Sequence, residues 1–584
     1  MSTDSSDATL DLTISENIQS LLKSYRKMQM PMGQYVSFIM VPSVGFLIVT
    51  GILAFVLPLP MSIRLPIPLL GMLAFLSAVF YPKILLSQRK RQLNNRFHLM
   101  VTHMTILATT KIDRMEVFRT LAEEDEYGEL ANELRRVVEL VDTWNQSLDD
   151  ALRRRSNEVP SDTLSDFFER LAYTMGAGQS LRKYLLTEQE QILENYATVY
   201  ESSLDNLEVM KDLYLSMVLS MTFALVFAVV LPVLTGTEPT MTVSAVILLY
   251  IFIQTAFFLA MRSLSPYDPV WYHPESKPSA VESKITRSFY FGVGLTAVLM
   301  VISVTGIIGL SPIGLATFIP GISDPLPLPF YAVIPVTPLI VPGFVLNRAE
   351  KRVKARDQEY PSFIRALGTT EAVKQSTSSD VLSTLRNKDF GPLTNNVDDL
   401  YKRLNMRIEP TEAWRYFTAD CRSYLIQTFS EMYLMGREMG GDPQLLGELI
   451  SENMNRSLQL REQRNQASTT LIGLLYGITA ASTFAFFIGL EVVNVISELG
   501  LDLDTGAGID VGQIIQPDVY NIPLIEFLLI VVIMFSAMLS SLMVRTVDGG
   551  HKINTYLHFV LLAWISALVA TFTRWLINTF LAVG

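Results

Sequence analysis

The sequence has few of the residues that carry out chemistry in proteins. Its 584 residues include one cysteine, Cys421, so no disulfide can form within the chain. The five histidines are scattered, and the spacing of His98 and His103 differs from the i, i+4 spacing of a helical metal pair. No Gly-x-x-x-x-Gly-Lys-Ser/Thr motif occurs, which excludes a P-loop nucleotide site. We therefore expect no enzymatic activity, no metal and no cofactor.

Charge is also scarce. Charged residues make up 18% of the chain and hydrophobic residues 49%, whereas a soluble protein has roughly a quarter charged residues. A helix needs about 20 mostly apolar residues to cross the hydrocarbon core of a membrane. Nine such runs occur, near 37–59, 65–82, 214–234, 241–261, 288–310, 326–346, 468–490, 524–544 and 556–579. These runs predict an all-α, polytopic membrane protein with about nine transmembrane helices.

The central parts of these runs lack Asp, Glu, Lys and Arg. Proton and ion relays need ionisable groups inside the membrane, so this absence disfavours a transporter or an ion-driven rotor. Glu491, Glu526 and Arg574 lie at the ends of runs, where interfacial placement is ordinary. Gln254 is the main polar side chain at depth, and a hydrogen bond between helices explains it.

Long polar segments separate the runs and give the predicted order of domains. An N-terminal tail over 1–36 includes an amphipathic helix with Ile18, Leu21 and Tyr25 on its apolar face. Transmembrane helices over 37–82, 214–346 and 468–584 alternate with two helical domains over 83–213 and 347–467. The membrane ends next to the tail and both domains are rich in Lys and Arg, while the loop 491–523 carries six acidic and no basic residues. By the positive-inside rule the N-terminus and both domains are cytoplasmic and the C-terminus is outside.

Both polar domains have the same helical pattern near their ends. An apolar stripe ends at Gly176 and Gly178 in the first domain, and at Gly440 and Gly441 in the second. After each glycine pair a new helix begins. In the first domain neither Gly nor Pro interrupts residues 179–231, so the helix that begins there is predicted to continue into the membrane. The two corners therefore indicate one duplicated unit. Pro335, Pro338 and Pro342 predict a kinked, buried span between 326 and 346.

The unit resembles the type II secretion system F domain family, the membrane platform proteins of type II secretion, type IV pilus and archaellum (archaeal flagellum) machines. The resemblance rests on a basic membrane exit, an opening like Phe97-His98-Leu99-Met100, a stretch like Ser147-Leu148-Asp149-Asp150-Ala151-Leu152 and the glycine-broken helix pair. In the second copy the opening at 361–367 fits, but Pro410-Thr411-Glu412-Ala413-Trp414 is only an approximate counterpart. Two such domains and about nine spans look most like the archaellum branch of the family.

The resemblance implies partners as well as a fold. Family members contact a hexameric secretion or motor ATPase through basic cytoplasmic loops, and they work with filament subunits and other archaellum components. The basic residues of this chain that we assign to ATPase docking are Arg89, Lys90, Arg91, Arg153, Arg154, Arg155, Arg348, Lys351, Arg352, Lys354, Arg356, Lys402, Arg403 and Arg407. For Arg89–Arg91 and for the basic residues between Arg348 and Arg356, anchoring at the membrane edge is the alternative. For Arg153–Arg155 the alternative is a solvated helix face. The family also implies a homo-oligomer, a dimer; membrane lipid is the other expected partner, and nucleic acid is not one.

The function that the resemblance implies is mechanical coupling of the ATPase to filament assembly or rotation. The platform of an adhesive type IV pilus or of a type II secretion-like system is the nearest alternative, because it uses the same unit. A membrane transporter is an alternative of a different class.

Overall fold

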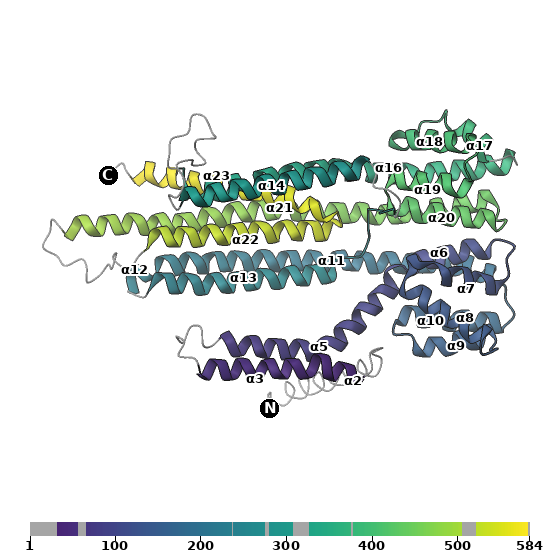
Figure 1. The fold of residues 1–584 in the computed structure, drawn as a ribbon, viewed down its shortest axis with the longest axis horizontal. Coiled ribbons are helices and arrows are strands. Elements are labelled where there is room, and N and C mark those ends of the chain that lie inside the picture. Colours follow the sequence, from purple (N-terminus) through teal and green to yellow (C-terminus); the bar gives the residue numbers. More distant parts are fainter. Residues whose placement is uncertain are drawn as a thin grey trace, which may run out of the picture. The chain divides into compact units, whose positions relative to one another are not determined.

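The computed structural model describes residues 32–56, 66–235, 238–274, 280–307, 326–374, 378–504 and 521–581. Helices account for nearly all of these residues, and the predicted all-α fold is confirmed (Figure 1). The chain divides into two compact units, Met1–Ile192 and Leu193–Gly584. The predicted amphipathic helix of the tail lies outside the described residues, as does much of the acidic loop 491–523.

The first unit contains a helical hairpin and a bundle. One arm of the hairpin consists of α2 (Met32–Tyr35), the π-helical turn η1 (Val36–Met40) and α3 (Val41–Val56), and the other arm is α5 (Pro66–Asn95). The Tyr35 hydroxyl joins the two arms by donating a hydrogen bond to the Ala78 carbonyl at 2.8 Å. The helices of the bundle are α6 (Phe97–Ala108), α7 (Arg114–Glu123), η2 (Asp125–Tyr127), α8 (Glu129–Asp142), α9 (Leu148–Glu158) and α10 (Asp162–Gly176).

The bundle forms because apolar stripes meet in its centre and polar caps define its helix ends. Phe97 and Phe167 pack edge to face with ring centroids 5.4 Å apart, and Met100 and Phe118 are fully buried. Ser161 accepts a hydrogen bond from the Leu164 amide at 3.2 Å, so it is the N-cap of α10.

The second unit contains most of the apolar helices. They are α11 (Leu181–Val230, which begins in the first unit), α12 (Pro232–Thr235), α13 (Pro239–Leu264), α14 (Ala280–Ile307), α15 (Leu328–Val336), α16 (Ile340–Lys374), α21 (Pro443–Asp504), α22 (Ile522–Asp548) and α23 (Thr555–Leu581). Within the unit α13 packs on α22, and α21, α22 and α23 pack on one another. The Ser536 hydroxyl bonds the Gln254 amide oxygen at 3.1 Å, which is the hydrogen bond between helices that the sequence predicts.

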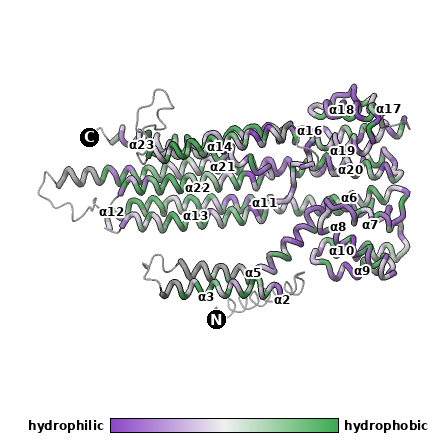
Figure 2. Tube along the Cα trace, viewed as in Figure 1, coloured by the Kyte–Doolittle hydropathy of each residue, from purple (hydrophilic) through white to green (hydrophobic). Residues whose placement is uncertain are grey.

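Eight described helices are long and apolar enough to cross a membrane. They lie within Gly33–Ile52, Leu181–Val233, Pro239–Leu264, Ser283–Ile307, Leu328–Lys374, Pro443–Ile496, Ile522–Asp548 and Lys552–Phe580. The second predicted span, 65–82, is not among these eight; it falls mostly in the first half of α5, where many side chains lie outside the described residues, so it stays a prediction. Figure 2 shows hydrophobic residues along α13 and α22 and more hydrophilic residues along α9 and α18 (Thr394–Asn405).

Proline breaks the sixth span where the sequence predicts it. Helix α15 ends at Val336, a 3₁₀ turn, η4 (Thr337–Leu339), follows, and α16 begins at Ile340. Pro335, Pro338 and Pro342 are all buried. Helix α16 then continues past Pro361 into the second helical domain.

The second domain repeats the helix order of the first. The C-terminal half of α16 is followed by α17 (Ser378–Leu385), η5 (Gly391–Leu393), α18, α19 (Pro410–Cys421) and α20 (Tyr424–Glu438), and α21 leads back to the membrane. The segment after α13 reaches this domain: the Tyr272 amide donates to the Arg422 carbonyl at 3.0 Å, and the Tyr424 amide donates to the Val270 carbonyl at 3.1 Å.

Candidate functional site

A buried carboxylate organises the first domain. Glu133 on α8 has no exposed surface, and its carboxylate accepts hydrogen bonds from Arg89 at 2.7 Å, from Arg136 at 2.9 Å and from Arg155. Arg89 comes from α5 and Arg155 from α9, so this cluster joins α5 to two helices of the bundle. Because a buried charge needs partners, these arginines stabilise the domain.

The other basic residues predicted in the first domain lie at its surface. Lys90 forms an ion pair with Asp162, and Arg154 lies 3.8 Å from Glu158 with about half of its side chain exposed. Arg91 and Arg153 are exposed. The predicted group at 153–155 is thus divided, since Arg155 points into the Glu133 cluster and its two neighbours point outward.

The second domain has its own buried carboxylate. Glu371 on α16 accepts hydrogen bonds from the Tyr433 hydroxyl at 2.6 Å and from Arg437 at 2.7 Å, both on α20. Burial, with the Glu371 charge, raises the pKa of Tyr433, which therefore stays protonated. Burial also raises the pKa of the Cys421 thiol, so this cysteine is an inert core residue.

The predicted basic residues of the second domain fall into two groups. Arg356 donates to the carbonyls of Asp420 at 3.0 Å and Cys421 at 3.3 Å, and Arg403 pairs with Asp420 at 2.6 Å. Lys402 pairs with Asp398 at 2.8 Å on the surface, and these hydrogen bonds raise the pKa of Lys402 and lower that of Asp398. The exposed residues of the predicted set are Arg348, Lys351 and Arg352 on α16, Lys402 on α18 and Arg407 in the turn after α18.

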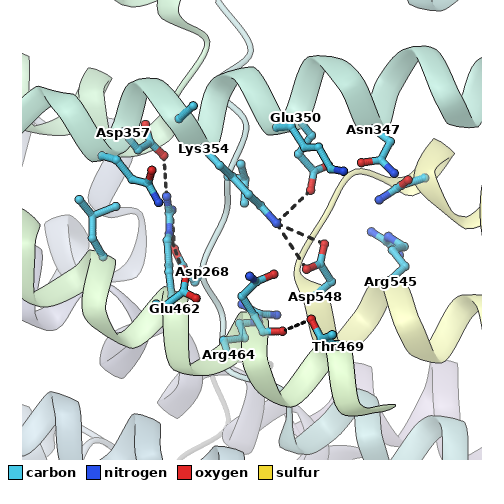
Figure 3. A pocket seen from close by; sticks show the side chains of 18 of the residues that line it. Asp268, Asn347, Glu350, Lys354, Asp357, Glu462, Arg464, Thr469, Arg545 and Asp548 are labelled. Carbon is cyan, nitrogen blue, oxygen red and sulfur yellow. Dashed lines mark hydrogen bonds and ion pairs between the residues drawn. The ribbon is translucent and has the colours of Figure 1, made fainter. Parts of the chain in front are cut away.

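An ionic cluster lies at the charged ends of the spans in the second unit (Figure 3). Arg461 on α21 makes two hydrogen bonds of 2.7 Å to Asp268, in the segment after α13, and one of 2.8 Å to Asp357 on α16. The adjacent Lys354 lies 3.4 Å from both Glu350 and Asp548. These pairs join α16, α21, the segment after α13 and the end of α22, and they surround a pocket. Sequence reasoning missed Arg461 and Asp268 because they are 193 residues apart.

Of the four predicted helix-break glycines, Gly176 is the last residue of α10, and Gly178, Gly440 and Gly441 lie between helices. Helix α10 ends at Gly176 and α11 begins at Leu181, while α20 ends at Glu438 and α21 begins at Pro443. Gly178 and Gly440 have φ angles of 76° and 82°, which glycine adopts without steric cost. Each break redirects the chain into a helix that enters the membrane.

The helices that leave the domains are long. The first, α11, has 50 residues, and α21 has 62, so they extend for about 75 Å and about 93 Å at 1.5 Å per residue. Each combines a polar part that belongs to a helical domain with an apolar part long enough to cross a membrane.

A second ionic cluster lies near the opposite ends of the spans. Arg574 on α23 pairs with Glu491 on α21 at 2.7 Å and with Glu526 on α22 at 2.8 Å, and the two glutamates are at least nine-tenths buried. Although these residues are at span ends, as the sequence indicates, they join three helices instead of standing singly at the interface. Among the residues described, no group of three His, Cys, Asp or Glu side chains could hold a metal ion.

Comparison with known proteins agrees with this architecture. Residues 100–230 match the family described as type II secretion system (T2SS), protein F, which covers the helices from α6 to α11. The "Flagella accessory protein J" of Methanocaldococcus jannaschii is 31% identical over 543 residues, which are 92% of this chain and 93% of that protein. The protein of the same name from Methanococcus voltae is 30% identical, over 89% of this chain and 90% of its own. The chain belongs to the flagella accessory protein J family. The family that the sequence motifs indicate is thereby confirmed.

No solved structure matches the chain. The two relatives in the flagella accessory protein J family match over nearly their whole lengths, so both helical domains and the apolar helices belong to the family architecture.

Proposed function

We propose that this chain is the membrane platform of an archaellum machine, where it couples a cytoplasmic hexameric ATPase to the assembly or rotation of a filament. The main support is structural: α11 and α21 are uninterrupted helices that carry a polar domain at one end and a membrane span at the other. Force applied to either domain is thus transmitted to the membrane through a continuous hydrogen-bonded rod, with no loop between them.

The proposal includes an orientation and partners. The N-terminus and both helical domains are cytoplasmic, and the C-terminus is outside. The ATPase and the filament components are the protein partners, lipid surrounds the spans, and the working form is a homodimer. No step of this function needs an active site in the chain itself, and we propose that it is not an enzyme.

The exposed basic residues are the best candidates for ATPase docking. Arg89, Arg155 and Arg356 are engaged in holding the domains together, so their charges are less available to a partner. Arg153 and Arg154 point outward from α9 and lie far from any span in the sequence, so membrane anchoring does not account for them.

Affinity purification of the full-length chain from native membranes tests the docking surface. We expect the wild type to retain the ATPase. The R153E/R154E variant should retain at least about tenfold less ATPase, because two positive charges become negative on a surface where charge complementarity governs association. The matched control is R182E/K183E, a reversal of two adjacent exposed basic residues of the same unit. Equal ATPase recovery in all three would contradict these docking residues, and no ATPase with the wild type would contradict the coupling function.

The related alternatives differ in what they serve. An adhesive pilus or secretion platform shares the protein F architecture, but both full-length relatives carry the flagella name, which favours the archaellum. The transporter alternative predicts substrate-dependent flux through the purified protein in vesicles. Such a flux would contradict the platform proposal.

A further inference from the structure

The ionic cluster that contains Arg461 and Lys354 surrounds a cavity of about 970 Å³. Its walls are the segment after α13, α16, α21, the last turn of α22 and the start of α23. Most of its charged groups are already neutralised, since Arg461 pairs with two aspartates and Lys354 lies between two carboxylates. Arg464 is likewise engaged, because it donates to the carbonyls of Val547 at 2.6 Å and Thr546 at 3.2 Å.

Arg545 is different. It lines the cavity from α22, and among the described residues no carboxylate forms an ion pair with it. Its Nε atom is enclosed and has no hydrogen-bond partner in the part of the chain that the structure describes. An enclosed N–H donor of this kind lacks the acceptor that would compensate its burial.

A second unsatisfied group lines the same cavity. The side-chain oxygen of Asn554 is enclosed without a partner among the described residues, and only 9% of Asn554 is exposed. Because the two ends of an amide are assigned by their hydrogen bonds, the reversed orientation would present an N–H donor instead. Asn347 lies near Arg545 on the wall formed by α16, as Figure 3 shows, and Lys351 adds a further cation to the lining.

We propose that this cavity binds a phosphate group, with Arg545 as its charged ligand. A guanidinium with an unsatisfied donor, side-chain amides and a lysine are groups that recognise a phosphate. A lipid headgroup fits better than a free phosphate ion, because the cavity is much larger than one phosphate and lies at the ends of membrane spans. Ile472 and Val544 also line it and provide apolar contacts for the first atoms of lipid chains.

Native mass spectrometry of the delipidated full-length protein tests this site. The probes are phosphatidylglycerol, zwitterionic phosphatidylcholine and inorganic phosphate. We expect phosphatidylglycerol to bind most tightly and R545Q to weaken that binding at least about tenfold, the loss of one charged hydrogen bond. R545K, which keeps the charge, should bind more tightly than R545Q. The matched control is R348Q, since Arg348 is an exposed arginine of α16 outside the cavity lining, and it should bind as the wild type does.

The outcomes separate the sources of phosphate. Binding of inorganic phosphate that equals lipid binding and depends on Arg545 would keep the phosphate site but assign it to a free ion. Equal lipid binding by wild type and R545Q would overturn the proposal, and so would a loss in R348Q as large as in R545Q.

Discussion

The residue on which the first domain most depends is Glu133. It lies in the apolar stripe of α8, between Leu130 and Val137, where a carboxylate is out of place unless it has partners. Its three arginines arrive from α5, α8 and α9. The stripe was the signal that could have identified Glu133 from the sequence, but the identity of its partners depends on tertiary structure.

Replacing Glu133 by Gln should destabilise the first domain by about 3–5 kcal/mol, because three arginines lose the buried charge that pairs with them. Hydrogen exchange of amides in α8 and α9 of the full-length protein measures the effect. The control is E139Q, which changes an exposed glutamate of the same helix and should leave exchange unaffected. Equal protection in E133Q and E139Q would show that the cluster contributes nothing.

His103 gives the first domain a dependence on pH. It is buried, its Nδ1 lies 3.0 Å from the Tyr127 hydroxyl, and burial lowers the pKa of His103 to about 3. The unfolded chain therefore binds a proton near pH 6.5 that the folded domain does not, so stability falls as the pH drops from about 6.5 toward 3.

We expect the free energy of unfolding of the first domain to fall by about 2 kcal/mol between pH 7 and pH 5 through His103 alone. H103F removes the titrating group and should flatten this part of the pH profile, as measured by exchange of the amides in α6. A profile in H103F as steep as in the wild type would mean that other groups cause the dependence.

At the scale of elements, the central features are the two long helices. The sequence predicts the continuity of α11 because residues 179–231 contain no Gly or Pro, and the structure confirms it. It also predicts the break in the sixth span from three prolines. The local backbone chemistry of glycine and proline decides both features, which is why they could be predicted without tertiary information.

Other local features escaped prediction. The turns between α8 and α9 and between α18 and α19 occupy matching places in the two domains, and each contains a non-glycine residue with positive φ, Asn145 at 51° and Arg407 at 59°. Each follows an exposed large apolar residue, Trp144 in the first domain and Met406 in the second. Because the residue types differ, the sequence hides a repeat that the backbone preserves.

Continuity of α11 should be necessary for coupling. S202P places a proline at an exposed position inside the helix, where it removes a backbone hydrogen bond and kinks the rod at a cost of about 3 kcal/mol. We expect S202P to reach the membrane in normal amounts, to retain the ATPase and to assemble few or no filaments. S202A is the matched control and should assemble filaments normally; normal assembly by S202P would contradict a rod that transmits force.

The crossing of α16 and α21 depends on two glycines. A Cβ atom on Gly368 would lie 2.2 Å from the Pro443 carbonyl oxygen, and one on Gly447 would lie 2.8 Å from that of Ile364. G368A should therefore lower the stability of the second domain by about 1–3 kcal/mol, since the backbones must separate. Thermal unfolding in detergent measures this. G294A, at a helical glycine with nothing within 4 Å of an added Cβ, should be neutral or slightly stabilising.

At the scale of the whole molecule, hydropathy alone predicts the class of protein, because a membrane requires long apolar helices whatever their packing. The sequence motifs also predict the family. The ionic clusters could not be predicted in the same way, since Arg461 meets Asp268 across 193 residues and Arg574 meets Glu491 across 83. Such pairings depend on which helices become neighbours, and a single sequence does not contain that information.

The most direct test of the central claim is deletion of this chain in its source organism, with the surface filaments identified by electron microscopy and swimming scored in parallel. The platform account predicts loss of motility filaments while adhesive pili remain, and recovery when the wild-type chain is restored. Loss of adhesive pili alone would assign the chain to a pilus system. Persistence of both filaments would contradict the account.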